Sequence, residues 1–305
     1  MDLSTTVGQL RLRSPLILGS GLLGAQADKL LEFSKVAGAV ITKSISLLPE
    51  QGSPPPRIAR IDREGMINSE GGMNPGIEAF SRTLQQIKSS LGCPLIGSLS
   101  PRTLRFDKGM EEVAVTFEEN GAEAIELNFK YLYDEQELRT DFSTKQITEI
   151  LTRLRRVVHI PLIAKLTYGG MDAAVLARAA EDAGAAAVSA INSVFPAMKI
   201  DIKKRAPVLP VKFGGLSGPS IRPLAVATVY RIASAVKIPT IGIGGIMSGE
   251  DVIEFLLAGA CAVQIYTIAL REGPGAFSRI LGGLESFMDD NGIGSLREVI
   301  GGAHE

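Results

Sequence analysis

Polar side chains that could bind a small ring follow several short apolar runs of the sequence. Lys43, Asn128, Lys165 and Asn192 each stand at the end of such a run. Ammonium and amide groups can pair with the carbonyl oxygens and ring nitrogens of a ligand. Taken singly, such a lysine is more often a solvated charge, and such an asparagine is more often a turn residue. The prediction of a binding site therefore depends on all four residues converging, which requires their strands to end at one place.

Residues 238–267 contain the clearest folding unit of the chain. A short apolar run ends in Gly244 and Gly245, an amphipathic stretch follows, and a second apolar run ends in Tyr266 and Thr267. Two strands around one helix predict a parallel βαβ unit. Glycines at the end of the first strand leave backbone N–H groups accessible to a ligand, and a phosphate would suit that place. A tight turn would explain the two glycines equally well.

Eight apolar runs of two alternating types recur along the sequence. One type follows a proline, at Pro15, Pro94, Pro161 and Pro239, and the other follows a Gly-Ala pair, at Gly38, Gly121, Gly184 and Gly259. A proline at the start of a strand costs little, and the Gly-Ala pair lets a helix turn tightly into the next strand. Because the runs are continuously apolar, we expect strands that are buried on both faces.

Stretches with helical spacing of apolar residues separate these strands, at residues 107–120, 143–158, 172–183 and 222–236. Eight strand–helix units close most economically as a barrel. We therefore predict an α/β fold in which residues 1–305 form a single (β/α)8 TIM barrel domain. A doubly wound open sheet is the alternative, and the number and regularity of the repeats disfavour it.

Two connections are much longer than the others and have no clear periodicity. They comprise residues 46–75 and residues 192–223. Long ordered loops are usually functional. Both follow the carboxyl end of a predicted strand, which is where barrel enzymes keep their chemistry.

The composition excludes several classes of protein. With 305 residues, 45% of them hydrophobic, the chain can bury a large core, and its net charge of −1 gives no reason to expect nucleic acid as a partner. No apolar run approaches the roughly 20 residues that span a bilayer. With only Cys93 and Cys261 present, we expect no disulfide framework, no cysteine metal cluster and a cytoplasmic location. His159 and His304 do not form a site, and no metal ligands can be assembled.

Several segments carry a resemblance to a known family. They are Gly-Ser-Gly at 19–21, Ile-Thr-Lys-Ser at 41–44, Asn-Pro-Gly at 74–76, Ala-Ile-Glu-Leu-Asn at 124–128, Gly-Gly-Leu-Ser-Gly-Pro at 214–219 and Val-Gln-Ile-Tyr-Thr at 263–267. In this order they resemble the dihydroorotate dehydrogenase family over nearly the whole chain. The Pro-Pro-Pro-Arg loop at 54–57 is similar to the soluble class of that family. The tail from Val263 looks closer to the membrane-bound class, but we expect no membrane-binding extension.

The resemblance implies FMN at the mouth of a (β/α)8 barrel. The residues that would contact it are Ser20, Gly21, Lys43, Ser44, Ser98, Asn128, Lys165, Ile191, Gly218, Gly244, Gly245, Tyr266 and Thr267. The residues that would line a pyrimidine site are Lys43, Asn68, Ser69, Glu70, Gly71, Gly72, Asn128, Asn192 and Ser193. A cation such as Lys165 would stabilise the negative charge of reduced flavin. The amides would pair with both the N–H and the C=O groups of the ring.

The sequence departs from the family where the catalytic base is expected. Soluble members have a cysteine there that removes a ring proton, but this chain has Phe129, Lys130 and Tyr131. The position of the base falls on Tyr131, which with Lys43 makes up the candidate catalytic set. An unperturbed phenol, with a pKa of about 10, is a better acid than base near neutrality, and Lys130 would lower that pKa. The alternative is that Tyr131 only packs the loop or stacks on a ligand. Glu70 also adds an acid beside a site that would hold an anionic orotate.

The leading hypothesis is an FMN-dependent oxidoreductase that transfers hydride between flavin N5 and dihydroorotate, orotate or a related pyrimidine. The rival hypothesis is a non-catalytic flavin- or ligand-binding subunit of a larger complex. An aldolase or isomerase barrel would need a Schiff-base lysine or metal ligands that the sequence does not supply. The resemblance also implies a homodimer and allows an electron-transfer partner subunit.

Overall fold

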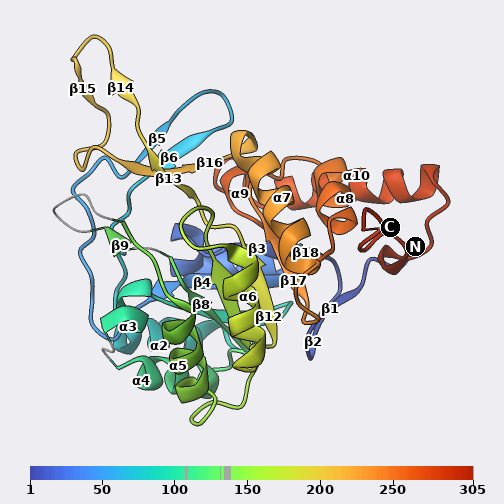
Figure 1. Cartoon of the computed structure of the whole chain (residues 1–305), viewed down its shortest axis with the longest axis horizontal. Coiled ribbons are helices and arrows are strands. Elements are labelled where there is room, and N and C mark those ends of the chain that lie inside the picture. The colour runs from blue at the N-terminus through green and yellow to red at the C-terminus, as the bar shows by residue number, and fades with distance from the viewer. Residues whose placement is uncertain (107–108, 131, 134–138, 305) are drawn as a thin grey trace.

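Eight parallel strands close into a barrel at the centre of the molecule. The computed structural model describes residues 1–106, 109–130, 132–133 and 139–304. The barrel strands are β3 (Leu16–Leu18), β4 (Ala39–Ile45), β7 (Leu95–Leu99), β8 (Ala124–Asn128), β11 (Leu162–Leu166), β12 (Ala187–Ala190), β17 (Thr240–Ile243) and β18 (Ala260–Ile265). They pair in chain order, and β18 closes on β3 (Figure 1). The predicted (β/α)8 TIM barrel is therefore confirmed, and each strand lies in one of the eight predicted runs.

The Gly-Ala pairs have the backbone conformation that the prediction requires at three of the four positions. Gly121, Gly184 and Gly259 have φ angles of +89°, +85° and +97°. Side chains rarely adopt this left-handed conformation, whereas glycine does so freely after a helix. The next strand can then start immediately.

Helices surround the barrel (Figure 1). They are α1 (Ala27–Ser34), α2 (Ile77–Ile87), α3 (Pro101–Phe106), α4 (Met110–Glu119), α5 (Thr144–Leu154), α6 (Ala173–Asp182), α7 (Arg222–Ala233), α8 (Gly249–Leu257), α9 (Thr267–Glu272) and α10 (Gly275–Asp290). Short 3-10 turns are η1 (Leu22–Ala25), η2 (Pro219–Ile221) and η3 (Leu296–Glu298). Ser143 and Ser248 begin α5 and α8 with capping boxes, which satisfy the first backbone N–H groups. The four predicted helical stretches contain α4, α5, α6 and α7.

An N-terminal hairpin closes one end of the barrel. Its strands are β1 (Thr5–Val7) and β2 (Leu10–Leu12), and its buried side chains are Val7, Leu10 and Leu12. These belong to one buried cluster with residues from all eight barrel strands, namely Ile17, Ala39, Ile41, Ile96, Ala124, Ile163, Ala187, Ile241 and Ala262. This layer of side chains fills the amino-terminal end of the barrel interior.

The two long connections form a second sheet beyond the carboxyl ends of the barrel strands. Strands β5 (Ile58–Arg60) and β6 (Met66–Asn68) come from the first connection, and β13 (Val194–Ala197) and β16 (Gly214–Ser217) come from the second. The antiparallel order is β13-β16-β6-β5. Two short pairs complete the fold, β9 (Leu132–Tyr133) with β10 (Arg139–Thr140), and β14 (Ile200–Asp201) with β15 (Ala206–Pro207). The sequence predicted the length and the place of both connections but none of these strands.

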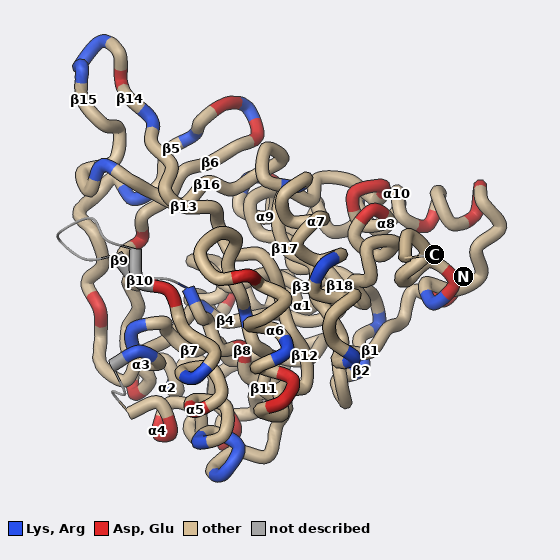
Figure 2. The backbone as a smooth tube through the Cα atoms, viewed as in Figure 1, with Lys and Arg blue, Asp and Glu red and all other residues tan. Residues whose placement is uncertain are grey.

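Charged residues of both signs are distributed around the outside of the molecule (Figure 2). Lys203, Lys204 and Arg205 lie at the tip of the β14–β15 hairpin, which projects away from the barrel (Figure 1). Within the described ranges, no helix is long and apolar enough to cross a membrane.

Candidate active site

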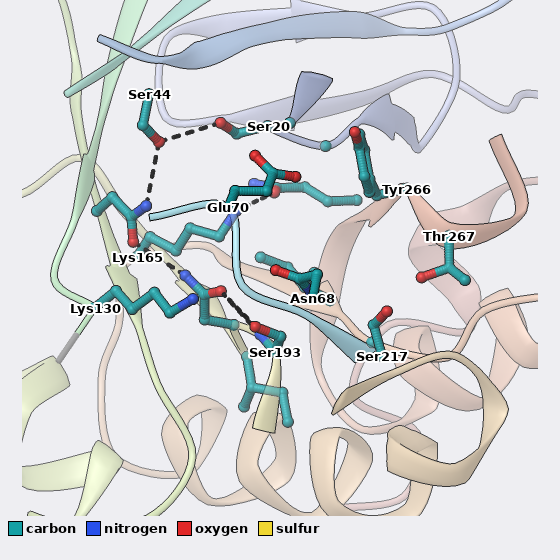
Figure 3. A pocket seen from close by; sticks show the side chains of 18 of the residues that line it. Ser20, Ser44, Asn68, Glu70, Lys130, Lys165, Ser193, Ser217, Tyr266 and Thr267 are labelled. Atoms are coloured by element: carbon teal, nitrogen blue, oxygen red, sulfur yellow. Dashed lines mark hydrogen bonds between the residues drawn. The ribbon is translucent and has the colours of Figure 1, made fainter. Parts of the chain in front are cut away.

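A large pocket opens at the carboxyl ends of the barrel strands. It contains about 1340 Å³ of space, including the part that is open to solvent. The second sheet, β13-β16-β6-β5, forms one wall, because Met66 and Asn68 of β6 and Ser217 of β16 line the pocket together with the ends of the barrel strands (Figure 3).

Most residues that the sequence assigned to the two binding sites line this one pocket. They are Ser20, Gly21, Lys43, Ser44, Asn68, Glu70, Gly71, Gly72, Asn128, Lys165, Ile191, Asn192, Ser193, Gly218, Gly244, Gly245, Tyr266 and Thr267. Ser98 and Ser69 are not among the lining residues. Ser98 is fully buried one layer deeper, where its hydroxyl lies 2.9 Å from that of Ser44. The Ser69 hydroxyl lies 3.5 Å from that of Ser53. The backbone N–H of Ser69 donates a hydrogen bond to the carbonyl oxygen of Arg57.

Lys165 is held at the floor of the pocket by a buried polar network. Its Nζ donates to Glu126 Oε1 at 3.0 Å and to Gln264 Oε1 at 2.9 Å. Glu126 is fully buried and also accepts hydrogen bonds from Ser189 Oγ and Gln264 Nε2. The four side chains come from four barrel strands, β8, β11, β12 and β18. Because a buried carboxylate needs such partners, the network fixes a cation at the floor.

Lys43 and Glu70 form a second ion pair within the pocket. Lys43 lies on β4, and Glu70 lies on the loop that follows β6. Their side chains are only 9% and 14% exposed. Gly71 and Gly72, with φ angles of +67° and +77°, form the turn beyond Glu70. The carboxylate therefore compensates the charge of Lys43, which the resemblance places in both binding sites.

A chain of hydroxyl and amide groups crosses the pocket from β4 to β12. The Asn128 amide donates to Ser44 Oγ at 3.2 Å, and Asn192 donates to Asn128 Oδ1 at 3.0 Å. Ser193 N–H then donates to Asn192 Oδ1 at 2.8 Å. Asn68 Nδ2 donates to the Gly215 carbonyl at 3.1 Å. These bonds orient three amides, which between them offer both donors and acceptors, around the same space.

Glycines surround the other end of the pocket. Gly218, Gly244 and Gly245 have φ angles of +104°, +129° and +77°. A Cβ added at Gly245 would lie 2.8 Å from Arg222 Cβ and 2.9 Å from the Gly218 carbonyl oxygen. The loops after β16 and β17 thus approach each other in a way that no side chain would permit.

Tyr266 anchors the opposite side of this end. Its hydroxyl accepts a hydrogen bond from the Leu22 N–H at 2.7 Å. A Cβ at Gly21 would lie 2.1 Å from the Tyr266 ring, so the glycine is needed for the ring to fit. Burial raises the pKa of the Tyr266 phenol, which therefore stays protonated near neutrality.

Several residues in or beneath the pocket were missing from those predicted from the sequence, among them Glu126, Gln264, Lys130 and Ser217. Glu126 and Gln264 interrupt otherwise apolar strands, and that interruption was a readable signal. Lys130 lines the pocket beyond the end of β8, whereas its place in the sequence predicts only a neighbour of Tyr131. The predicted catalytic residue Tyr131 lies outside the described residues.

Both cysteines, which the structure describes, lie away from the pocket. Cys93 directly precedes β7, and Cys261 lies near the start of β18, where its carbonyl accepts a hydrogen bond from Thr5. Burial raises the pKa of each thiol to about 12. Neither thiol is placed to exchange a proton with a ligand in the pocket.

The two histidines also lie away from the pocket. His304 stacks on Tyr230 with 4.0 Å between ring centroids. His159 is exposed, and its ring lies 3.7 Å from Glu118. Among the described residues, no group of His, Cys, Asp and Glu could hold a metal ion.

A closed (β/α)8 barrel with a polar pocket at the carboxyl ends of its strands has the arrangement of a barrel enzyme. The chain belongs to the dihydroorotate dehydrogenase family, because the sequence model described as dihydroorotate dehydrogenase matches residues 2–288. The family resemblance seen in the sequence is therefore confirmed.

Several relatives match almost end to end. The chain is 38% identical over 308 residues to the dihydroorotate dehydrogenase B (NAD(+)), catalytic subunit, of Methanothermobacter thermautotrophicus, with 99% of each chain covered. The protein of the same name from Pyrococcus abyssi is 38% identical over 296 residues, with 96% of each chain covered. That from Thermodesulfovibrio yellowstonii is 37% identical over 309 residues, with 99% of each covered.

Proposed function

We propose that this chain is an FMN-dependent oxidoreductase that interconverts a dihydropyrimidine and its unsaturated ring, dihydroorotate and orotate or a related pair. The observation that carries the proposal is one pocket in which three oriented amides, three lysines and a glycine-lined end meet. Membership of the dihydroorotate dehydrogenase family supports the same reaction class.

The glycine-lined end fits the phosphate of FMN. Gly218 and Gly245 approach each other so closely that a side chain at Gly245 would clash, and Ser217 and Thr267 add hydroxyls beside these glycines. Such backbone concavities bind anions. Bound FMN would supply the hydride acceptor at its N5. Lys165, fixed by Glu126 and Gln264, provides a positive charge that would stabilise reduced flavin.

The oriented amides fit a pyrimidine ring. Asn68, Asn128 and Asn192 line the space next to Lys43. An amide presents both a donor and an acceptor, which matches the alternating N–H and C=O groups of such a ring. Their existing hydrogen bonds to Ser44 and Gly215 limit rotation of the side chains, so the ring would be bound in one orientation.

We further propose that the chain works with an electron-transfer partner and forms a homodimer. The relatives from three organisms are each named as a catalytic subunit, which implies further subunits in those proteins. A partner would accept the electrons after the ring has been oxidised.

A second candidate function is a flavin- or ligand-binding subunit without catalysis. The Lys43–Glu70 ion pair favours it, because a carboxylate there repels the anionic orotate. The positions of Cys93 and Cys261, both away from the pocket, favour it as well.

Anaerobic mixing separates the two functions. The purified protein is loaded with FMN and mixed with dihydroorotate or with dihydrouracil, and flavin absorbance is recorded. Bleaching by either compound supports the oxidoreductase. A protein that takes up no FMN overturns the oxidoreductase and leaves only a subunit that binds another ligand. A flavin that stays oxidised with both compounds supports the non-catalytic flavin-binding subunit.

A further inference from the structure

Lys130 is directed into the pocket by the packing of its neighbour. The Phe129 N–H bonds to the Lys165 carbonyl at 3.0 Å, which continues the pairing of β8 with β11 by one residue. The Phe129 ring is buried in the core, with its centroid 5.2 Å from that of Phe142. Successive side chains of an extended segment point to opposite sides. With Phe129 fixed in the core, the Lys130 side chain extends into the pocket toward Ser193 (Figure 3).

The surroundings of Lys130 favour an amine that can exchange a proton. Burial lowers the pKa of Lys130 to about 8; the negative charge of Glu70 opposes this shift, and the positive charges of Lys43 and Lys165 add to it. Near neutrality, part of the Lys130 population is then a neutral amine with a lone pair.

Other titratable groups among the described pocket residues are less suited to this task. The ammonium groups of Lys43 and Lys165 donate hydrogen bonds to the carboxylates of Glu70 and Glu126 within ion pairs. The Tyr266 phenol has its pKa raised by burial. The chain's two thiols, Cys93 and Cys261, are at other places in the fold. General acid–base catalysis uses groups whose pKa lies near the working pH, and the Lys130 amine is such a group.

We propose that the Lys130 amine transfers the proton in the ring oxidation, a role that depends on the proposed function. Its Nζ lone pair takes a proton from the ring carbon adjacent to the one that loses hydride. The electron pair of the broken C–H bond becomes the second bond of the new C=C, and the flavin, as oxidant, receives the hydride with its pair. In the reverse direction, the Lys130 ammonium returns the proton to carbon.

Two variants distinguish proton transfer by Lys130 from a contribution of its positive charge alone. Lys130→Arg keeps the charge but does not titrate near neutrality, and Lys130→Gln removes the charge. Lys204→Arg, on the exposed β14–β15 hairpin, is the matched control, because its side chain is 81% exposed. For each FMN-loaded protein, the bleaching rate is recorded from about pH 6 to pH 10 with the dihydropyrimidine that bleaches the parent. The FMN content and the dissociation constant of the unsaturated ring are measured separately.

We expect the bleaching rate of the parent to rise with pH and to level off above about pH 8, because the neutral amine is the base. Lys130→Arg lowers the rate about 100-fold or more, the usual contribution of a general base. It also abolishes the pH dependence near 8, whereas FMN content and ring binding change less than about threefold. Lys204→Arg behaves as the parent does.

Two outcomes overturn the inference while the proposed function stands. In the first, Lys130→Arg bleaches as fast as the parent. In the second, Lys130→Gln weakens ring binding and Lys130→Arg restores both binding and rate, which makes Lys130 an anchor for an anionic group. If the parent itself fails to bleach with every dihydropyrimidine, the proposed function fails and this inference fails with it.

Discussion

Lys43 and Glu70 join β4 to the loop after β6 through a largely buried ion pair. The Glu70 carboxylate therefore pairs with the cation, Lys43, to which the carboxylate of a substrate would otherwise bind. A substrate with its own carboxylate must displace Glu70 from Lys43, whereas a neutral ring can leave the pair intact. The pair therefore bears on the choice between orotate and an uncharged pyrimidine.

Glu70→Gln is expected to strengthen orotate binding about tenfold. The neutral amide no longer repels the orotate carboxylate and frees the Lys43 charge, and hydrogen bonds to charged groups are worth about 1.5–3 kcal/mol. Binding of uracil, which has no carboxylate, should change little. Titration of the FMN protein with each ring, followed by the flavin spectrum, measures both constants. Equal changes for the two rings would mean that Glu70 does not discriminate by charge.

Glu70→Gln is also expected to shift the pH dependence of the bleaching rate to lower pH. The negative charge of Glu70 favours the protonated form of Lys130 and so raises its pKa, while burial lowers it to about 8. Removing that charge lowers the pKa further, so the bleaching rate should level off at a lower pH than in the parent. Bleaching rates of Glu70→Gln across the pH range check this, and a profile that moves upward would contradict it.

Glu126→Gln is expected to destabilise the fold. Glu126 is fully buried and accepts from Lys165, Ser189 and Gln264, so the change leaves the Lys165 ammonium without its counter-charge. Breaking a buried pair costs about 3–5 kcal/mol. Urea unfolding monitored by circular dichroism measures the loss.

The matched control for Glu126 is Glu78→Gln. Glu78 pairs with Arg82 at 3.0 Å on the surface, where the side chains are 88% and 72% exposed. Exposed pairs contribute little, so the unfolding midpoint should stay within error of the parent. Equal midpoints for the two variants would show that the floor network does not stabilise the barrel.

Local signals in the sequence were sufficient to predict the barrel. The prolines and Gly-Ala pairs mark each strand, and the Gly121, Gly184 and Gly259 backbones have the conformation that this role requires. The loop strands were not predictable in the same way, because β6 pairs with β16, far along the chain, through Asn68 and Gly215. No local periodicity records a pairing at that separation.

The candidate site was predictable where a residue ends a strand and unpredictable where packing decides its direction. Lys43, Asn128 and Lys165 lie at or near strand ends and reach the pocket as expected. Lys130 reaches it only because Phe129 packs on Phe142. Ser98 has the right position in the sequence, but its hydroxyl contacts that of Ser44 below the pocket surface. Contacts between segments that are distant in the sequence place Lys130 in the pocket and Ser98 beneath it.

Tyr131→Phe tests the base that was predicted from the sequence, and that prediction stands untested because Tyr131 lies outside the described residues. If Lys130 carries the proton, Tyr131→Phe should bleach within about threefold of the parent, because a phenol of ordinary pKa near 10 contributes little as a base at neutral pH. The measurement is the anaerobic bleaching rate beside that of Lys130→Arg. A loss of about 100-fold in Tyr131→Phe with an active Lys130→Arg would assign the proton to the tyrosine.

Gly245→Ala is expected to weaken FMN retention at least tenfold. Gly245 has a φ of +77°, and its Cβ would lie 2.8 Å from Arg222 Cβ, so the added methyl group separates the loops that border the proposed phosphate site. Backbone strain of this kind costs about 1–3 kcal/mol, the order of a tenfold change in affinity. Gly282→Ala is the matched control, because Gly282 lies in α10 with no heavy atom within 4 Å of an added Cβ. Flavin absorbance per protein after gel filtration reports retention. Full flavin in Gly245→Ala would place the phosphate elsewhere in the pocket.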